Sequence, residues 1–102
     1  GGMRKRVGVA RALVGNPEYI LYDEPTTGLD PITSEQIDNL IHDLSQKLAV
    51  TSVVITHDIF SVYKIAHTVA MLEKGTVRFF GTVDELRASD DSVVKEFIER
   101  YQ

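Results

Sequence analysis

Two adjacent acidic residues, Asp23 and Glu24, stand directly after the apolar run Tyr19–Tyr22. A run this apolar predicts a buried strand, so both carboxylates should emerge at its carboxyl end, where open parallel sheets hold their ligands. Pro25 ends the strand, and the Thr-Thr-Gly that follows it predicts a polar turn. This arrangement suits one carboxylate beside a metal ion and the other facing a water molecule beside a phosphate.

A histidine also follows an apolar run. His57 comes after the run Thr51–Thr56, which predicts a second buried strand. A lone histidine in such a place is most often a hydrogen-bonded polar group without a chemical role. A zinc site built from His57, Asp58 and His67 is an alternative, but no metal-ligand spacing supports it. We interpret His42 as a helix-surface residue and His67 as a strand-edge residue.

Two glycines, Gly1 and Gly2, precede a pattern that predicts a helix ending at Gly15-Asn16-Pro17. The apolar positions of this helix recur at helical spacing and are Met3, Val7, Ala10 and Val14. Glycines let a phosphate approach backbone amides, and the positive end of a helix favours an anion. The sequence therefore indicates a phosphate contact at the start of this helix.

The same helix carries a cluster of basic residues, Arg4, Lys5, Arg6 and Arg11. A nucleic-acid patch is one interpretation, but no aromatic residues interleave the cluster and the net charge of the chain is −4. We therefore expect no nucleic-acid partner. The cluster is better interpreted as a solvated helix face near a nucleotide phosphate.

The elements that position these residues alternate between helix and strand. Asp30-Pro31 predicts a capped helix with proline at its first position. Its apolar stripe consists of Ile37, Leu40, Ile41, Leu44 and Leu48. This alternation, with buried strands at 18–23 and 51–56, predicts an α/β fold with a mainly parallel sheet flanked by helices.

The last third of the chain predicts a hairpin and three short helices. Asp58 caps a helix that runs to about Ala66, and Lys74-Gly75 forms the turn between strands 68–73 and 76–80. Residues 82–85 form a capping box that opens another helix. A final helix from about Ser89 carries Val94, Phe97, Ile98 and Tyr101 on one face. We expect the aromatic residues Phe79, Phe80, Phe97 and Tyr101 to pack in the core or at its ends.

Length and composition set the class of protein. The chain has 102 residues, 43% of them hydrophobic and 25% charged, as expected for one ordinary globular domain spanning residues 1–102. It has no cysteine, which excludes disulfides and cysteine metal sites. No apolar stretch reaches the ~18 residues of a membrane span, so we expect any membrane role to depend on a partner.

Together these motifs resemble the carboxyl-terminal part of the ATPase subunit of an ABC transporter, over nearly the whole chain. Residues 1–4 resemble the end of the signature motif, and residues 20–24 resemble the Walker B strand with its following glutamate. Residues 28–30 resemble the D-loop, and His57 resembles the switch histidine. The amino-acid sequences of residues 1–7 and 22–31 are most similar to those of the ATPases of Mce/Mla-type lipid-transport systems.

The resemblance implies ATP and Mg²⁺ as cofactors and gives roles to three residues. It implies that Asp23 holds Mg²⁺ through water, because Mg²⁺ dehydrates reluctantly. It implies that Glu24 polarises the water that attacks the γ-phosphate. His57 would then sense the γ-phosphate and help to hold that water.

The resemblance also implies a dimer of two ATPase subunits. Gly1, Gly2 and Met3 would face the ATP bound by the opposite subunit, and Asp30 would serve as dimer contact and helix cap. Met3 stands where glutamine is commoner, so the backbone contacts are the ones we expect here. Permease subunits in the membrane would hold the ATPase at the cytoplasmic face.

No G-x-x-x-x-G-K-[ST] motif is present, so the phosphate cradle and its lysine are missing. We therefore expect a partial P-loop NTPase (RecA-like) fold without the amino-terminal half that carries Walker A. The chain alone should bind nucleotide weakly or not at all, and its exposed strands should make it self-associate. Two alternatives stay open: a non-transport ABC ATPase, in translation or DNA repair for example, and a truncated, non-enzymatic assembly module.

Overall fold

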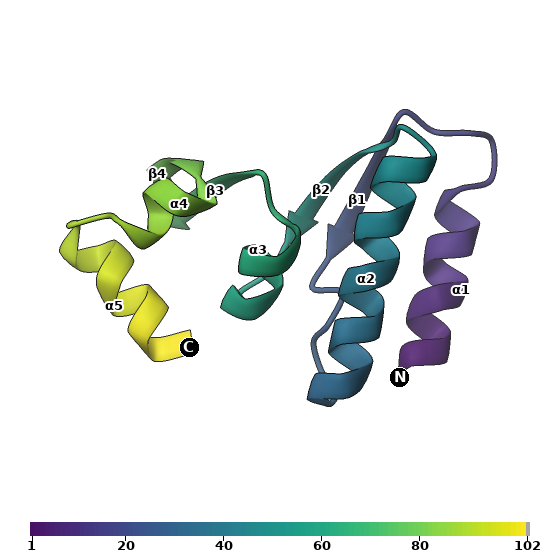
Figure 1. Ribbon diagram of the computed structural model, residues 1–102, viewed down its shortest axis with the longest axis horizontal. Coiled ribbons are helices and arrows are strands. Elements are labelled where there is room, and N and C mark those ends of the chain that lie inside the picture. Colours follow the sequence, from purple (N-terminus) through teal and green to yellow (C-terminus); the bar gives the residue numbers. More distant parts are fainter. Residues whose placement is uncertain (102) are drawn as a thin grey trace. The chain divides into compact units, whose positions relative to one another are not determined.

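The computed structural model describes residues 1–101, which form two compact units. The first unit spans Gly1–His57 and the second begins at Asp58. The first contains helix α1 (Gly2–Ala12), strand β1 (Tyr19–Asp23), helix α2 (Pro31–Lys47) and strand β2 (Thr51–Ile55). In Figure 1, α1 and α2 lie side by side next to the two strands.

Strands β1 and β2 pair in parallel, as the sequence predicts. Their register runs from Tyr19 opposite Thr51 to Asp23 opposite Ile55. The whole of α2 connects them, which is the connection that parallel neighbours require. The carboxyl ends of both strands therefore lie at the same edge of the sheet, and the residues that follow each strand start from neighbouring positions.

Helix α2 begins where the sequence predicts. Asp30 is its N-cap: the Oδ2 of Asp30 accepts the backbone N–H of Thr33 over 3.0 Å, and Pro31 occupies the first turn. Ile37 and Ile41 of the predicted stripe are buried. The last residue of the stripe, Leu48, lies just after the end of α2 and is 51% exposed.

Helix α1 is present as predicted, but its apolar positions at helical spacing are not the residues that are buried. Met3 and Val14 are 75% and 81% exposed, and Val7 and Ala10 are exposed too. The face that is buried or half-buried lies at the same spacing and consists of Gly2, Lys5, Val9 and Leu13. A Cβ on Gly2 would lie 2.7 Å from the Cγ2 of Thr33, so this glycine lets the first turn of α1 approach the start of α2 closely.

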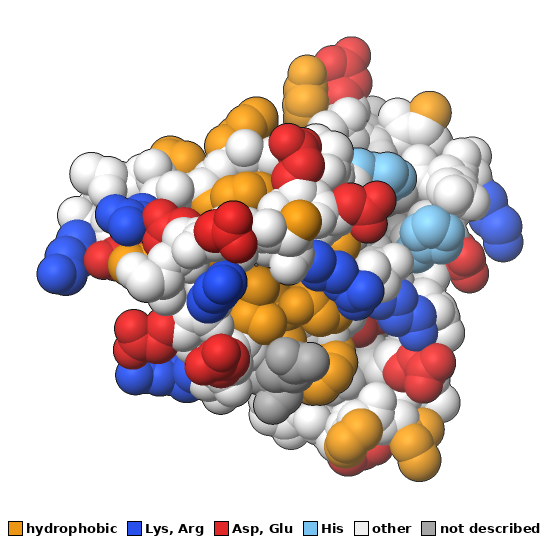
Figure 2. All heavy atoms as spheres, turned by 60° about the vertical axis from the view of Figure 1, so that its left-hand side comes forward, with side chains coloured by type: hydrophobic (Ala, Val, Ile, Leu, Met, Phe, Trp, Pro, Cys, Tyr) orange, Lys and Arg blue, Asp and Glu red, His pale blue; other side chains and the backbone are white. Residues whose placement is uncertain are grey.

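The strands are buried on one face only, which corrects the expectation of full burial. Ile20 and Tyr22 are buried, whereas Tyr19 and Leu21 are 66% and 73% exposed. On β2, Thr51 is exposed, and so are the apolar residues Val53 and Ile55 at 47% and 53%. The described residues cover one side of this sheet and leave the other largely uncovered. Hydrophobic side chains are also visible at the surface of the molecule in the space-filling view (Figure 2).

The second unit contains helix α3 (Ile59–Ile65), strands β3 (Thr68–Glu73) and β4 (Thr76–Thr82), and helices α4 (Val83–Arg87) and α5 (Ser92–Tyr101). The strands form the predicted antiparallel hairpin. Its turn residues Lys74 and Gly75 both have positive φ, 48° and 80°. The predicted caps are present, since Asp58 caps α3 and Thr82 with Glu85 forms the capping box of α4.

The core of the second unit differs from prediction in one respect. Ile59, Leu86 and Val94 are its buried centre, with Phe79 and Phe97 packed against them. Tyr101 stacks on Phe97 with ring centroids 4.8 Å apart, but Phe80 points outward and is 72% exposed. Alternation along β4 explains this outcome, because neighbouring residues of a strand face opposite sides.

Helix α5 begins later than predicted, at Ser92 instead of about Ser89. The carboxylate of Asp91 accepts the backbone N–H groups of Val93 and Val94, at 2.8 and 3.4 Å, and this contact sets the helix start. None of the helices in the described part of the chain has the length and apolar character needed to cross a membrane.

Candidate functional site

Glu24 and His57 meet at the carboxyl edge of the parallel sheet. Glu24 follows β1 and its backbone N–H donates to the carbonyl of Ile55, the last residue of β2, over 2.7 Å. The Nδ1 of His57 lies 3.0 Å from the Oε1 of Glu24, although 33 residues separate them in the sequence. The parallel register thus brings together two residues that the sequence singled out separately.

The backbone at Glu24 takes a conformation that few residues adopt. Its φ is 49°, in the left-handed region that non-glycine residues rarely occupy. The turn that follows supports it: the hydroxyl of Thr27 donates to the Oε2 of Glu24 over 3.0 Å, and Gly28 has a φ of 80°. Such backbone geometry often marks functional sites, where surrounding contacts hold it in place.

The protonation states of the pair follow from these contacts. Burial opposes ionisation of Glu24, but the hydrogen bonds with His57 and Thr27 outweigh it and lower the pKa of Glu24. An ionised carboxylate only accepts hydrogen bonds, so the Nδ1 of His57 carries the hydrogen between them. The Glu24 side chain is 35% exposed, so its remaining lone pairs are open to water. The arrangement can therefore orient a water molecule and accept its proton.

Asp23 lies next to this pair, at the exposed last position of β1. The described residues include no group of three or more histidine, cysteine or acidic side chains that could hold a metal by themselves. Mg²⁺ in nucleotide sites keeps several waters and needs only one or two carboxylates beside the phosphates. A single exposed carboxylate at the strand end fits that kind of site, in which bound Mg²⁺ would neutralise phosphate charge.

The glycine end of α1 has a packing role in this structure. Gly1 is the N-cap of α1 and supplies no side-chain cap, and Gly2 contacts Thr33 as described above. Met3 is exposed. The absence of a Gly2 side chain therefore has a structural reason, and the phosphate contact of residues 1–3 stays a prediction.

Both carboxylate oxygens of Asp30 accept hydrogen bonds from Thr33 at the start of α2. Its Oδ1 accepts the hydroxyl of Thr33 over 2.6 Å in addition to the backbone contact of Oδ2. The hydrogen bonds from the Thr33 side chain and backbone lower the pKa of Asp30. Its cap role is thus confirmed, while its role in a dimer contact stays a prediction.

Sequence reasoning missed Lys5 as a neighbour of the site. The Nζ of Lys5 donates to the carbonyl oxygen of Glu24 over 3.2 Å, in a partly buried contact. Lys5 was interpreted as part of a solvated basic face. A signal was available, because Lys5 stands three residues after Gly2 and four before Val9, which places all three on one side of the helix.

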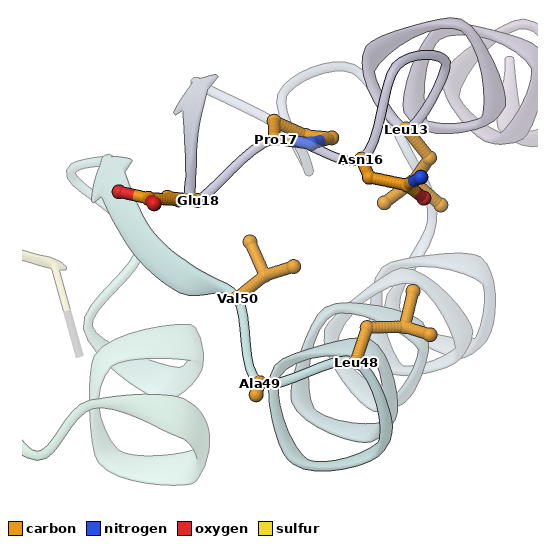
Figure 3. Close-up of a pocket in the computed structure, with 7 residues that line it drawn as sticks. All are labelled: Leu13, Asn16, Pro17, Glu18, Leu48, Ala49 and Val50. Carbon is orange, nitrogen blue, oxygen red and sulfur yellow. The ribbon is translucent and has the colours of Figure 1, made fainter.

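A hollow of about 370 Å³ lies at the opposite edge of the same sheet. In Figure 3, residues before β1 face residues before β2 across it. Its lining is Leu13, Asn16, Pro17, Glu18, Leu48, Ala49 and Val50. It is mostly apolar and lies at the amino ends of the strands, so it does not belong to the site around Glu24.

The sequence and the fold of this chain are similar to part of longer ATP-binding proteins. One similar solved structure is the dimeric post-hydrolysis state of the ATP-binding cassette MJ0796 bound to ADP and phosphate, with a TM-score of 0.71 and 38% identity. It covers 80% of this chain and 35% of that one. The chain is thus similar to part of a P-loop NTPase fold, as the sequence predicts. No family model matches the chain.

Curated relatives are more specific. The chain is 44% identical over 101 residues to the methionine import ATP-binding protein MetN of Halalkalibacterium halodurans. It is 40% identical over 101 residues to MetN 2 of Listeria innocua. In both cases the match covers 98% of this chain and 30% of the relative, so the chain spans less than a third of their length. The predicted likeness to lipid-transport ATPases is not supported by these relatives.

Proposed function

We propose that the chain is part of the ATP-binding subunit of an ABC transporter and carries the hydrolytic half of its active site. The observation that supports this most directly is the Glu24–His57 pair at the carboxyl edge of a parallel sheet, with a 3.0 Å contact between the two side chains. The two units would belong to one ATPase domain that spans residues 1–102.

In this proposal Glu24 is the general base. Its carboxylate orients the attacking water and takes its proton, while His57 holds the carboxylate through Nδ1–H. Asp23 would hold Mg²⁺ through water. When bound, Mg²⁺ supplies charge neutralisation of the phosphates of ATP.

The complete site would need a second subunit. Gly1, Gly2 and Met3 would contact the ATP of the opposite subunit through backbone amides, and Asp30 would lie at the dimer contact. The ATP-binding cassette MJ0796, to which the chain is similar, is dimeric with ADP and phosphate bound, which supports a dimer. Permease subunits would hold the ATPase at the cytoplasmic face of the membrane.

The transported substrate is proposed from the relatives. These relatives are ATP-binding proteins of methionine import. They favour an amino-acid importer over the lipid transporter that the sequence motifs suggested. The same relatives favour a transporter over an ABC ATPase of translation or DNA repair. Specificity would lie in the membrane subunits, so transport of methionine and of lipid should be compared in the assembled system.

The decisive experiment is Glu24→Gln in the full-length protein. We expect the rate of ATP hydrolysis to fall by about 10²–10⁴-fold while ATP binding persists, because only the proton acceptor is lost. Glu18→Gln is the matched control, since Glu18 precedes β1 at the other edge of the sheet and should leave turnover unchanged. Hydrolysis near the wild-type rate in Glu24→Gln would refute the assignment of the general base.

A further inference from the structure

We propose that Lys5 is a positioning residue for Glu24, and that it links the glycine end of α1 to the proposed general base. This inference rests on the proposed function of Glu24 and deepens it. The observation that carries it is the hydrogen bond from the Nζ of Lys5 to the carbonyl oxygen of Glu24, at 3.2 Å across 19 residues of sequence.

The position of Lys5 on α1 is unusual for a lysine. Its neighbours on the inward face are Gly2, Val9 and Leu13, whereas the adjacent cations Arg4 and Arg6 are exposed. Partial burial of a lysine costs side-chain entropy and desolvation, which an acceptor for its ammonium group offsets. The Glu24 carbonyl is that acceptor, so the contact differs from an incidental surface pairing.

The backbone conformation of Glu24 requires contacts that hold it in place. Two backbone hydrogen bonds hold its left-handed φ of 49°. The Glu24 N–H donates to the carbonyl of Ile55, and the Thr27 N–H donates to the carbonyl of Glu24 over 3.3 Å. Lys5 adds a charged donor to that same carbonyl, and charged donors form stronger hydrogen bonds than neutral ones. Without Lys5, the carbonyl of Glu24 loses its charged donor, so fewer contacts hold the backbone from which the carboxylate reaches His57.

Lys5 also connects two halves of the proposed mechanism. It stands one turn after Gly2, on the helix whose start is proposed to face the nucleotide of the second subunit. A shift of α1 on dimer formation would therefore reach the Glu24 backbone through one side chain. This predicts that Lys5 affects the turnover step more than nucleotide binding.

The test compares Lys5→Met, Lys5→Arg and the matched control Lys47→Met in the full-length protein. Lys47 is an exposed lysine in the last turn of α2. The readouts are kcat and KM for ATP, and the hydrogen-exchange rate of the backbone amides from Glu24 to Gly28. We expect Lys5→Met to lower kcat about tenfold and to speed exchange by a similar factor, with KM within about twofold of wild type. Lys5→Arg should restore most of both, and Lys47→Met should change neither.

Glu24→Gln in the same assay keeps the two proposals separate. If Glu24→Gln turns over at the wild-type rate, the proposed function fails, whereas faster exchange in Lys5→Met would still support the Lys5 contact. If Glu24→Gln is inactive but Lys5→Met keeps wild-type kcat or wild-type exchange, only the Lys5 proposal is overturned. The Lys5 proposal would also be overturned if Lys5→Arg restored neither kcat nor the exchange rate relative to Lys5→Met. Equal losses of kcat in Lys47→Met would overturn it as well.

Discussion

At the scale of single residues, the chemistry of this chain depends on how a few carboxylates are held. Glu24 has its two oxygens engaged by different partners, His57 and Thr27, on opposite sides of one turn. A carboxylate held in this way stays ionised and keeps a fixed direction, which a general base requires. Asp23, next to it, is free of such restraint at the exposed strand end and suits a water-mediated metal contact.

A second carboxylate gives a test of pH dependence. The Oδ2 and Oδ1 atoms of Asp91 accept the Nε and Nη2 of Arg78 at 2.9 and 3.2 Å. The guanidinium and the amide of Val93 hold the pKa of Asp91 below its ordinary value of 3.8. Because the folded pKa is lowered, the stabilisation is present above pH 3.8 and is lost as the pH falls through the folded pKa.

We therefore expect the stability of Asp91→Asn to depend less on pH in the acid range than the stability of the wild type does. Melting temperatures measured between about pH 6 and pH 2 should fall more steeply for the wild type than for Asp91→Asn. Asp90→Asn is the matched control, because the Asp90 side chain is fully exposed at 101%. A difference between wild type and Asp91→Asn that stays constant with pH would contradict the role of this ion pair.

At the scale of elements, the packing of α1 on α2 depends on one glycine. Gly2 lies where a Cβ would come 2.7 Å from the Cγ2 of Thr33. Thr33 cannot easily rotate that methyl away, because its hydroxyl donates to the Oδ1 of Asp30 over 2.6 Å. The close approach also sets which face of α1 turns inward, and with it the position of Lys5.

This packing predicts a non-additive pair of substitutions. Gly2→Ala should destabilise the protein by about 1–3 kcal/mol through overpacking, despite the better helix propensity of alanine. In a Thr33→Ser background the same change should cost little, because serine keeps the hydroxyl and lacks the methyl. Denaturant unfolding of the double-mutant cycle measures the coupling. Equal effects of Gly2→Ala in both backgrounds would show that the contact does not limit packing.

At the scale of the whole chain, the exposed apolar faces of the strands are the dominant feature. Leu21 is 73% exposed on β1 and Leu72 is 70% exposed on β3, a degree of exposure that favours association. The curated relatives are more than three times as long as the matched region, since it covers 30% of them. We expect the remaining part of such a protein to cover these faces, and the 102-residue chain to self-associate without it.

Association of the chain should respond to a charge on the uncovered face. Leu21→Lys should raise the dissociation constant of oligomers about tenfold or more, because burial of a leucine contributes about 1.5–3 kcal/mol. Ile32→Lys is the control, since Ile32 is 71% exposed but lies in the first turn of α2. Sedimentation velocity over a range of concentrations gives the readout. Monomeric wild-type chain at high concentration would refute the expectation.

The sequence by itself determined the local elements and the order of the motifs. Asp30 with Pro31, the Thr82–Glu85 capping box and the Lys74-Gly75 turn were predictable because each depends on residues a few positions apart. The alternation of apolar runs with amphipathic stripes also predicted the parallel pairing of β1 and β2.

The tertiary structure alone decided which faces are buried and which residues meet. The inward face of α1, the one-sided burial of β1 and the contact of Lys5 with Glu24 depend on residues far apart in the sequence. Two stripes of α1 have the same helical spacing, so periodicity could not choose between them. Contacts such as the close approach of Gly2 to Thr33 exist only once α1 and α2 are packed together.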